Sequence, residues 1–121
     1  MKNLLNREKL LKKEVLDVVK VDLGKDEFVF VRQMTGRERD KFEHSIISVT
    51  EDGKMDRKME DFRAKLAVCT VCDEKGVLSL EPTDYTLLSQ NMTAARLEKI
   101  VNVAQELNKI TEEDKEGLVK N

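Results

Sequence analysis

Two cysteines, Cys69 and Cys72, have the spacing of a C-x-x-C motif, which can serve thiol–disulfide exchange or metal binding. A redox pair places its first cysteine at an exposed helix N-terminus, where the helix dipole lowers the thiol pKa. Here the motif ends a predicted helix and belongs to the apolar run 66–72. The sequence therefore predicts that both cysteines are small buried hydrophobic residues. A thiol redox or metal protein using Cys69 and Cys72 remains an alternative.

The other residues that could do chemistry do not form a recognisable set. His44 is the only histidine, and a structural zinc site needs four ligands. The acidic run 112–114 fits the first turn of a helix capped by Thr111, where negative charge complements the macrodipole. The five glycines form neither a G-x-G-x-x-G nor a Walker pattern. We therefore expect no catalytic residue, no metal site and no cofactor, and a protein that is not an enzyme.

The composition indicates one domain with a strongly charged surface. The chain has 121 residues, of which 40% are hydrophobic, 38% are charged and 4% are aromatic, with a net charge of -2. Without a basic excess, nucleic acid is not expected as the main partner. No apolar run reaches the length of a membrane span, and the charged start is unlike a signal peptide. The expected location is the cytoplasm.

The first 14 residues form a separate amphipathic segment, and residues 15–121 are expected to form a single domain. Leu4, Leu5 and Leu11 lie among four lysines and one arginine and are not required by the core pattern of the domain. A short helix over residues 3–14 would dock on a partner protein, or on a second copy of the chain, as an amphipathic helix in a groove. We therefore predict these three leucines as partner-binding residues.

The domain itself is predicted to be α+β, with a small N-terminal antiparallel β-hairpin on a mainly helical body. Hydrophobic residues alternate with polar ones over 19–23, the run 28–32 is strand-like, and residues 24–27 between them form a turn. Thr35 and Glu38 have the spacing of a capping box, which predicts a helix to about Ser48 with Phe42 and Ile46 inward. Residues 49–56 are predicted to be a loop.

Further helices are predicted in the second half of the chain. Apolar residues spaced by three and four from Met55 to Cys69 indicate a long central helix, and residues 77–80 a short strand. Thr83 is expected to cap a short helix with Leu87 and Leu88 inward. Thr93 is expected to cap a longer helix, whose apolar stripe comprises Leu97, Ile100, Val101, Ala104 and Leu107.

Several stretches resemble the tail assembly chaperones of long-tailed bacteriophages, which also occur in prophages of Gram-positive bacteria. The order and spacing of the pieces carry the resemblance, which covers about residues 15–121. The resemblance to the N-terminal half of the family lies in residues 19–24, 28–32 and 34–40. The resemblance to its middle signature lies in residues 63–66 and 72–76, and that to its closing helix pair lies in residues 103–114. Residues 1–14 are not typical of the family.

The resemblance implies a non-enzymatic role in building the tail of a virion. Such a chaperone is absent from the mature virion, binds the aggregation-prone tape measure protein and brings tail tube protein to it. Many members also exist as a longer product made by ribosomal frameshifting. The alternative is a phage or host regulatory adaptor that binds another protein through the same helices. Self-association is left open, and neither nucleic acid nor a membrane is an expected partner.

Overall fold

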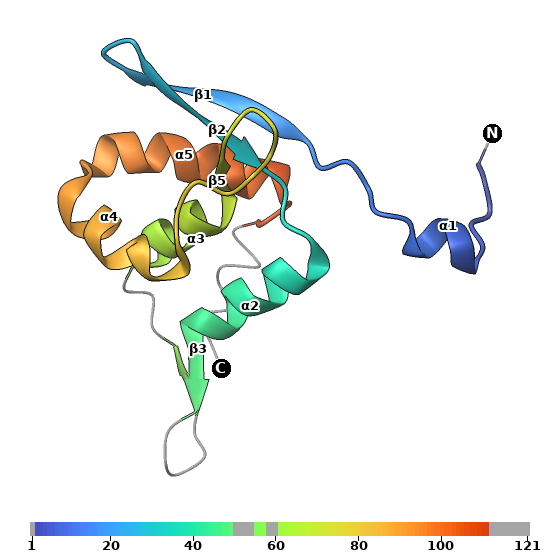
Figure 1. Cartoon of the computed structure of the whole chain (residues 1–121). Helices are drawn as coiled ribbons and strands as arrows, with labels where there is room; N and C mark the ends of the chain where they lie inside the picture. The colour runs from blue at the N-terminus through green and yellow to red at the C-terminus, as the bar shows by residue number, and fades with distance from the viewer. Residues whose placement is uncertain (1, 50–54, 58–60, 112–121) are drawn as a thin grey trace.

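The computed structural model describes residues 2–49, 55–57 and 61–111, which form the predicted α+β fold (Figure 1). A three-stranded antiparallel sheet in the order β1-β2-β5 lies beside the helices, and β3 and β4 form a separate small ribbon. The elements in chain order are α1 (Arg7–Leu11), β1 (Val18–Gly24), β2 (Glu27–Arg32), α2 (Gly36–Ile46), β3 (Ile47–Val49), β4 (Met55–Arg57), α3 (Phe62–Thr70), β5 (Val71–Cys72), the 3-10 turn η1 (Pro82–Asp84), α4 (Tyr85–Asn91) and α5 (Ala94–Leu107).

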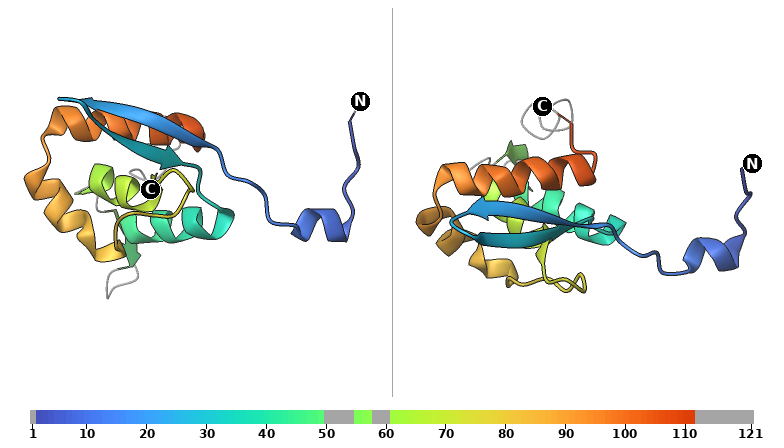
Figure 2. Two further views of the ribbon diagram at one scale, coloured as in Figure 1. Left: turned by 45° about the horizontal axis from the view of Figure 1, so that its top comes forward. Right: turned by 90° about the horizontal axis from the view of Figure 1, so that it is seen from above.

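The predicted N-terminal hairpin is confirmed. Strands β1 and β2 pair antiparallel from Val18 opposite Arg32 to Gly24 opposite Glu27. At the turn, Lys25 and Asp26 both have positive φ, 56° and 59°, which is the backbone of a tight hairpin turn. Pairing brings the alternating apolar residues of both strands onto one face of the sheet, and that face packs against α5 (Figure 2). The buried side chains of this face are Val21, Leu23 and Val31.

Helix α2 begins with the predicted capping box. The Thr35 N–H donates to Glu38 Oε1 at 2.9 Å, and the Glu38 N–H donates to Thr35 Oγ1 at 3.3 Å. Phe42 and Ile46 are buried as predicted, and the Phe42 ring meets Phe62 of α3 edge-on at 5.5 Å. The helix ends at Ile46, two residues before the predicted end.

The predicted central helix exists, but its predicted start at Met55 is wrong. Helix α3 begins at Phe62, whereas residues 55–57 form β4 and pair antiparallel with β3. The predicted loop over 49–56 is therefore wrong at both ends, because residue 49 belongs to β3 and residues 55 and 56 belong to β4. Asp61 has φ 63°, a left-handed conformation that a continuing helix cannot contain, so α3 must begin after it. Met59 lies outside the described residues.

Helix α3 is the buried centre of the fold. It packs against α2, α4 and α5, and Leu66, Ala67 and Thr70 are completely buried. The Thr70 hydroxyl donates to the Leu66 carbonyl at 2.8 Å, so this buried polar group has a partner. The chain then continues directly into β5, which pairs with β2.

The connection from β5 to α5 differs in detail from the prediction. In place of a strand over 77–80 there is an isolated bridge between Cys72 and Leu78. Glu81, not Thr83, caps the following turn, because its side chain and that of Asp84 form a reciprocal capping box. Leu88 is half-buried against the core, but Leu87 points to solvent, contrary to the prediction.

Helix α5 follows the prediction closely. The Thr93 hydroxyl accepts a hydrogen bond from the Arg96 N–H at 3.4 Å and caps the helix. The predicted stripe faces the core, with Leu107 half-buried and the other four residues buried. The helix predicted after Thr111 lies outside the described residues.

Candidate interaction surface

The two cysteines do not form an exposed reactive pair. Cys69 lies in the last turn of α3 and is half-buried, whereas Cys72 lies in β5 and is 4% exposed. Both are free thiols. Burial raises the pKa of Cys69, and the charge of Glu38 adds to that effect. Burial also raises the pKa of Cys72, against an opposing contribution from Arg32. A raised pKa leaves little thiolate at neutral pH, which is unfavourable for nucleophilic or redox chemistry.

We expect both thiols to react slowly with a thiol reagent in the native protein and rapidly in denaturant. Cys69 should react first, because it is half-buried whereas Cys72 is 4% exposed. The labelling rate should continue to rise at pH values where the rate of a free thiol control has levelled off, because the pKa values of both cysteines are raised. The measurement is time-resolved mass spectrometry, and equally fast labelling in the native and denatured protein would contradict it.

The other candidates for chemistry are dispersed. His44 is exposed near the end of α2. The acidic run 112–114 lies outside the described residues. Within the described residues, no group of three or more histidine, cysteine, aspartate or glutamate side chains could hold a metal ion.

A nearly buried ion pair was not predicted from the sequence. Arg32 of β2 is 6% exposed and donates twice to the Glu38 carboxylate, at 3.1 and 2.6 Å. Burial by itself would raise the pKa of Glu38, but hydrogen bonds from Arg32 and Thr35 outweigh it and lower that pKa. The pair joins the end of the sheet to the start of α2, which is a structural task. Of these contacts, only the capping box between Thr35 and Glu38 could be predicted from the sequence.

Stability should therefore depend on pH through Glu38. Its pKa is lower in the folded state, so its contribution is complete above the unfolded-state pKa of about 4.3 and is lost as pH falls through the folded-state value. At neutral pH, Glu38→Gln should lower the free energy of unfolding by roughly 1–3 kcal/mol, since Arg32 loses its charged partner. The difference from the parent should shrink in acid.

Denaturant unfolding across pH measures this effect. The matched control is Glu43→Gln, on the same helix, where Glu43 accepts from Arg39 in a half-buried pair four residues apart that lacks a buried arginine and should contribute less than about 1 kcal/mol. A Glu38→Gln profile that runs parallel to the parent profile at all pH values would refute the assignment.

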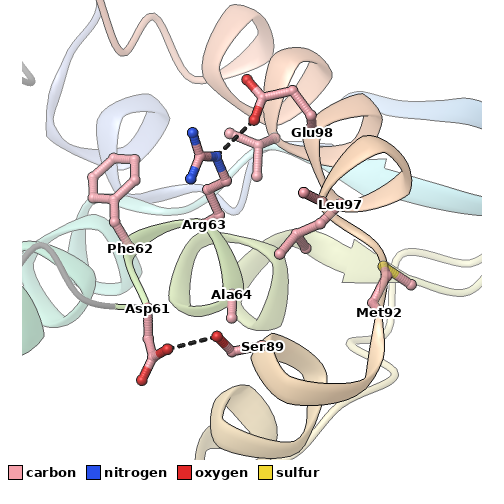
Figure 3. Close-up of a pocket in the computed structure, with 10 residues that line it drawn as sticks. Asp61, Phe62, Arg63, Ala64, Ser89, Met92, Leu97 and Glu98 are labelled. Carbon is pink, nitrogen blue, oxygen red and sulfur yellow. Dashed lines mark hydrogen bonds and ion pairs between the residues drawn. The ribbon is translucent and has the colours of Figure 1, made fainter.

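A cavity between α3, α4 and α5 carries polar groups on its rim (Figure 3). Its volume is about 260 Å³, and buried side chains such as Ala64 and Leu97 line it. Ser89 Oγ donates to Asp61 at 2.6 Å, and Arg63 pairs with Glu98 at 2.6 Å. His44 does not line it, so Ser89 and Asp61 have no histidine to complete a catalytic triad. These rim contacts hold helix ends together.

The N-terminal arm, residues 2–16, is the most exposed apolar part of the described chain. Figure 1 shows it leaving β1 and ending in α1, away from the body. Asn6 caps α1 by accepting from the Lys9 N–H at 3.0 Å, and no residue of α1 is buried. Leu4 is 97% exposed, Leu5 48% and Leu11 69%. The structure thus places the three predicted partner-binding leucines in solvent, although the helix is shorter than predicted.

The body carries a second apolar surface, which the sequence did not reveal. Two adjoining hollows of about 350 and 480 Å³ share Leu80, Leu88 and Met92. We call them together the α4 groove. Its apolar lining comes from β2, β5, the segment before η1, α4 with the residue after it, and α5. The main apolar residues are Phe28, Phe30, Leu80, Leu87, Leu88 and Met92.

Comparison with known proteins returns no matching family model, curated protein or solved structure. Across the described residues, no helix has the length and apolar character that crossing a bilayer requires.

Proposed function

We propose that this protein is a non-enzymatic tail assembly chaperone of a phage or prophage. It binds the tape measure protein, keeps it soluble and helps to recruit tail tube protein while the tail is built. It acts in the cytoplasm of the bacterial host and is not part of the mature virion. The observation that supports a binding role is the projecting arm, whose leucines are exposed to solvent although the arm itself is not typical of the family. The sequence resemblance supplies the identity of the partners.

The physical basis of the function is the shielding of apolar surface. A client with exposed apolar segments aggregates because those segments find one another. Exposed leucines on the arm offer such a segment an alternative partner, while the 38% of charged residues keeps the complex solvated. The raised pKa values of the two cysteines are compatible with a binding role.

Co-expression with the tape measure protein tests the proposal. The gene to use is the one in the same tail cluster, since a neighbouring tape measure gene is itself a requirement of the hypothesis. We expect the soluble fraction of the tape measure protein to rise, and the complex to survive moderate salt because apolar contacts dominate it. A solubility tag of similar size and charge is the control.

An unchanged soluble fraction, or a complex that dissociates in moderate salt, would refute the shielding mechanism. Capture of a different, well-folded protein in place of the tape measure protein would favour the regulatory adaptor.

A further inference from the structure

The α4 groove is an open apolar surface on an otherwise charged body. Phe28 is 50% exposed and Leu87 is 61% exposed, although both line it. Its one lining cation, Arg96, already pairs with Glu27 at 2.7 Å and donates to the Leu23 carbonyl. Such a surface is suited to a short segment with several apolar side chains.

The segment that borders the groove at Leu80 and Asp84 is negatively charged, although Lys20 Nζ lies 4.3 Å from the centroid of the Phe28 ring. Residues 73–84, which contribute Leu80 and Asp84 to its lining, contain four acidic side chains and one lysine, a net charge of -3. Asp84 and Glu81 cap η1 at its edge through their carboxylates. An occupant with basic residues beside its apolar ones would therefore be favoured over a neutral or acidic one.

The N-terminal arm has this chemistry. Residues 1–14 contain five basic and two acidic side chains, a net side-chain charge of +3. Since the whole chain has a net charge of -2, residues 15–121 have a net charge of -5. Leu10 and Leu11 are 65% and 69% exposed on α1, and Leu4 and Leu5 precede it. The arm thus matches the groove in both polarity and charge.

The geometry directs the arm away from its own groove. The Asp17 N–H donates to Gln33 Oε1 at 2.9 Å and the Gln33 N–H donates to the Asp17 carbonyl at 3.1 Å, which fixes where the arm leaves the sheet. Figures 1 and 2 show α1 beyond one end of the body and α4 at the opposite end. A second copy can present its groove to the arm without any reversal of the chain.

We propose that the arm of one copy, residues 2–16, docks in the α4 groove of a second copy. The contact is heterologous, since arm and groove are different surfaces, so it closes into a reciprocal pair or continues from copy to copy. Docking shields the exposed leucines of the arm from solvent. The inference concerns this chain alone and does not depend on the proposed function.

Two variants of the full chain, mixed after purification, test the contact. The arm variant is Leu10→Asp with Leu11→Asp, and the groove variant is Phe28→Asp with Leu87→Asp. All four side chains are about half exposed or more, so both variants should fold, which circular dichroism checks. Analytical ultracentrifugation over a wide range of concentrations should show that the parent self-associates and that each variant does so at least about tenfold more weakly.

Mixing is the decisive step. The intact arm of the groove variant should enter the intact groove of the arm variant, so the mixture should form a complex that neither variant forms by itself. Val77→Asp, which changes an exposed apolar residue outside the groove, should behave as the parent. A parent that is monomeric at all concentrations overturns the proposal. So does a groove variant that self-associates like the parent, which would indicate arm-to-arm pairing, or a mixture of folded variants that forms no complex.

Discussion

Replacing Leu66 with alanine is expected to lower the free energy of unfolding by roughly 2–5 kcal/mol. Leu66 is completely buried near the middle of α3, and this helix packs against α2, α4 and α5. The same core cluster contains Phe42, Ile46 and Ile100, each no more than 1% exposed. Removing the side chain therefore leaves a cavity that neighbouring helices cannot close without moving from their other contacts.

Denaturant unfolding of Leu66→Ala and of Val77→Ala measures this effect. Val77 is 61% exposed in the turn after β5, so its truncation should change stability by less than about 0.5 kcal/mol. The midpoint for Leu66→Ala should fall at an unchanged denaturant slope, which indicates a change of stability and not of compactness. A near-neutral result would mean that α3 is not the centre of the core.

Elements whose signals are local could be predicted from the sequence. The hairpin is one example, because alternation in β1 and turn residues at Lys25 and Asp26 determine both strands and their connection. The capping box of Thr35 and Glu38 and the Thr93 cap are others, since each involves residues three apart. In these segments local propensity agrees with the tertiary structure.

The errors occur where strand pairing or packing that the apolar spacing does not encode determines the structure. Met55 continues the helical spacing of α3, yet it lies in β4 because that segment pairs with β3. Leu87 has an apolar neighbour in Leu88 and was predicted to face inward with it, but adjacent residues on one helix turn point about 100° apart, and only Leu88 reaches the core. Periodicity gives the spacing of a face but not the residues that pack against it.

Of the two candidate surfaces, only one could be predicted from the sequence. The arm could be predicted, since its leucines stand outside the core pattern of the domain. The α4 groove could not, because Phe28, Leu80 and Met92 come from separate elements far apart in the sequence. Likewise, no local pattern connects Arg32 to Glu38 as a nearly buried pair.

Replacing the three arm leucines should abolish client binding without changing the stability of the fold. In the variant Leu4→Ser, Leu5→Ser and Leu11→Ser, no buried residue is altered. Burying each leucine against a partner contributes roughly 1.5–3 kcal/mol, before the cost of ordering the arm is subtracted. Loss of only two of these three leucines would already weaken the complex by roughly a hundredfold to ten-thousandfold.

Parallel measurement of the melting temperature and of tape measure protein binding tests this prediction. Lys12→Ser with Lys13→Ser, which changes the same arm without removing a leucine, is the matched control and should retain most of the binding. An unchanged melting temperature with lost binding supports the arm as the client site. Deleting residues 1–13 should reproduce both results, because the side chains removed are exposed wherever the structure describes them. A large fall in melting temperature would show that the leucines belong to the core, whereas unchanged binding would move the client site to the helical body.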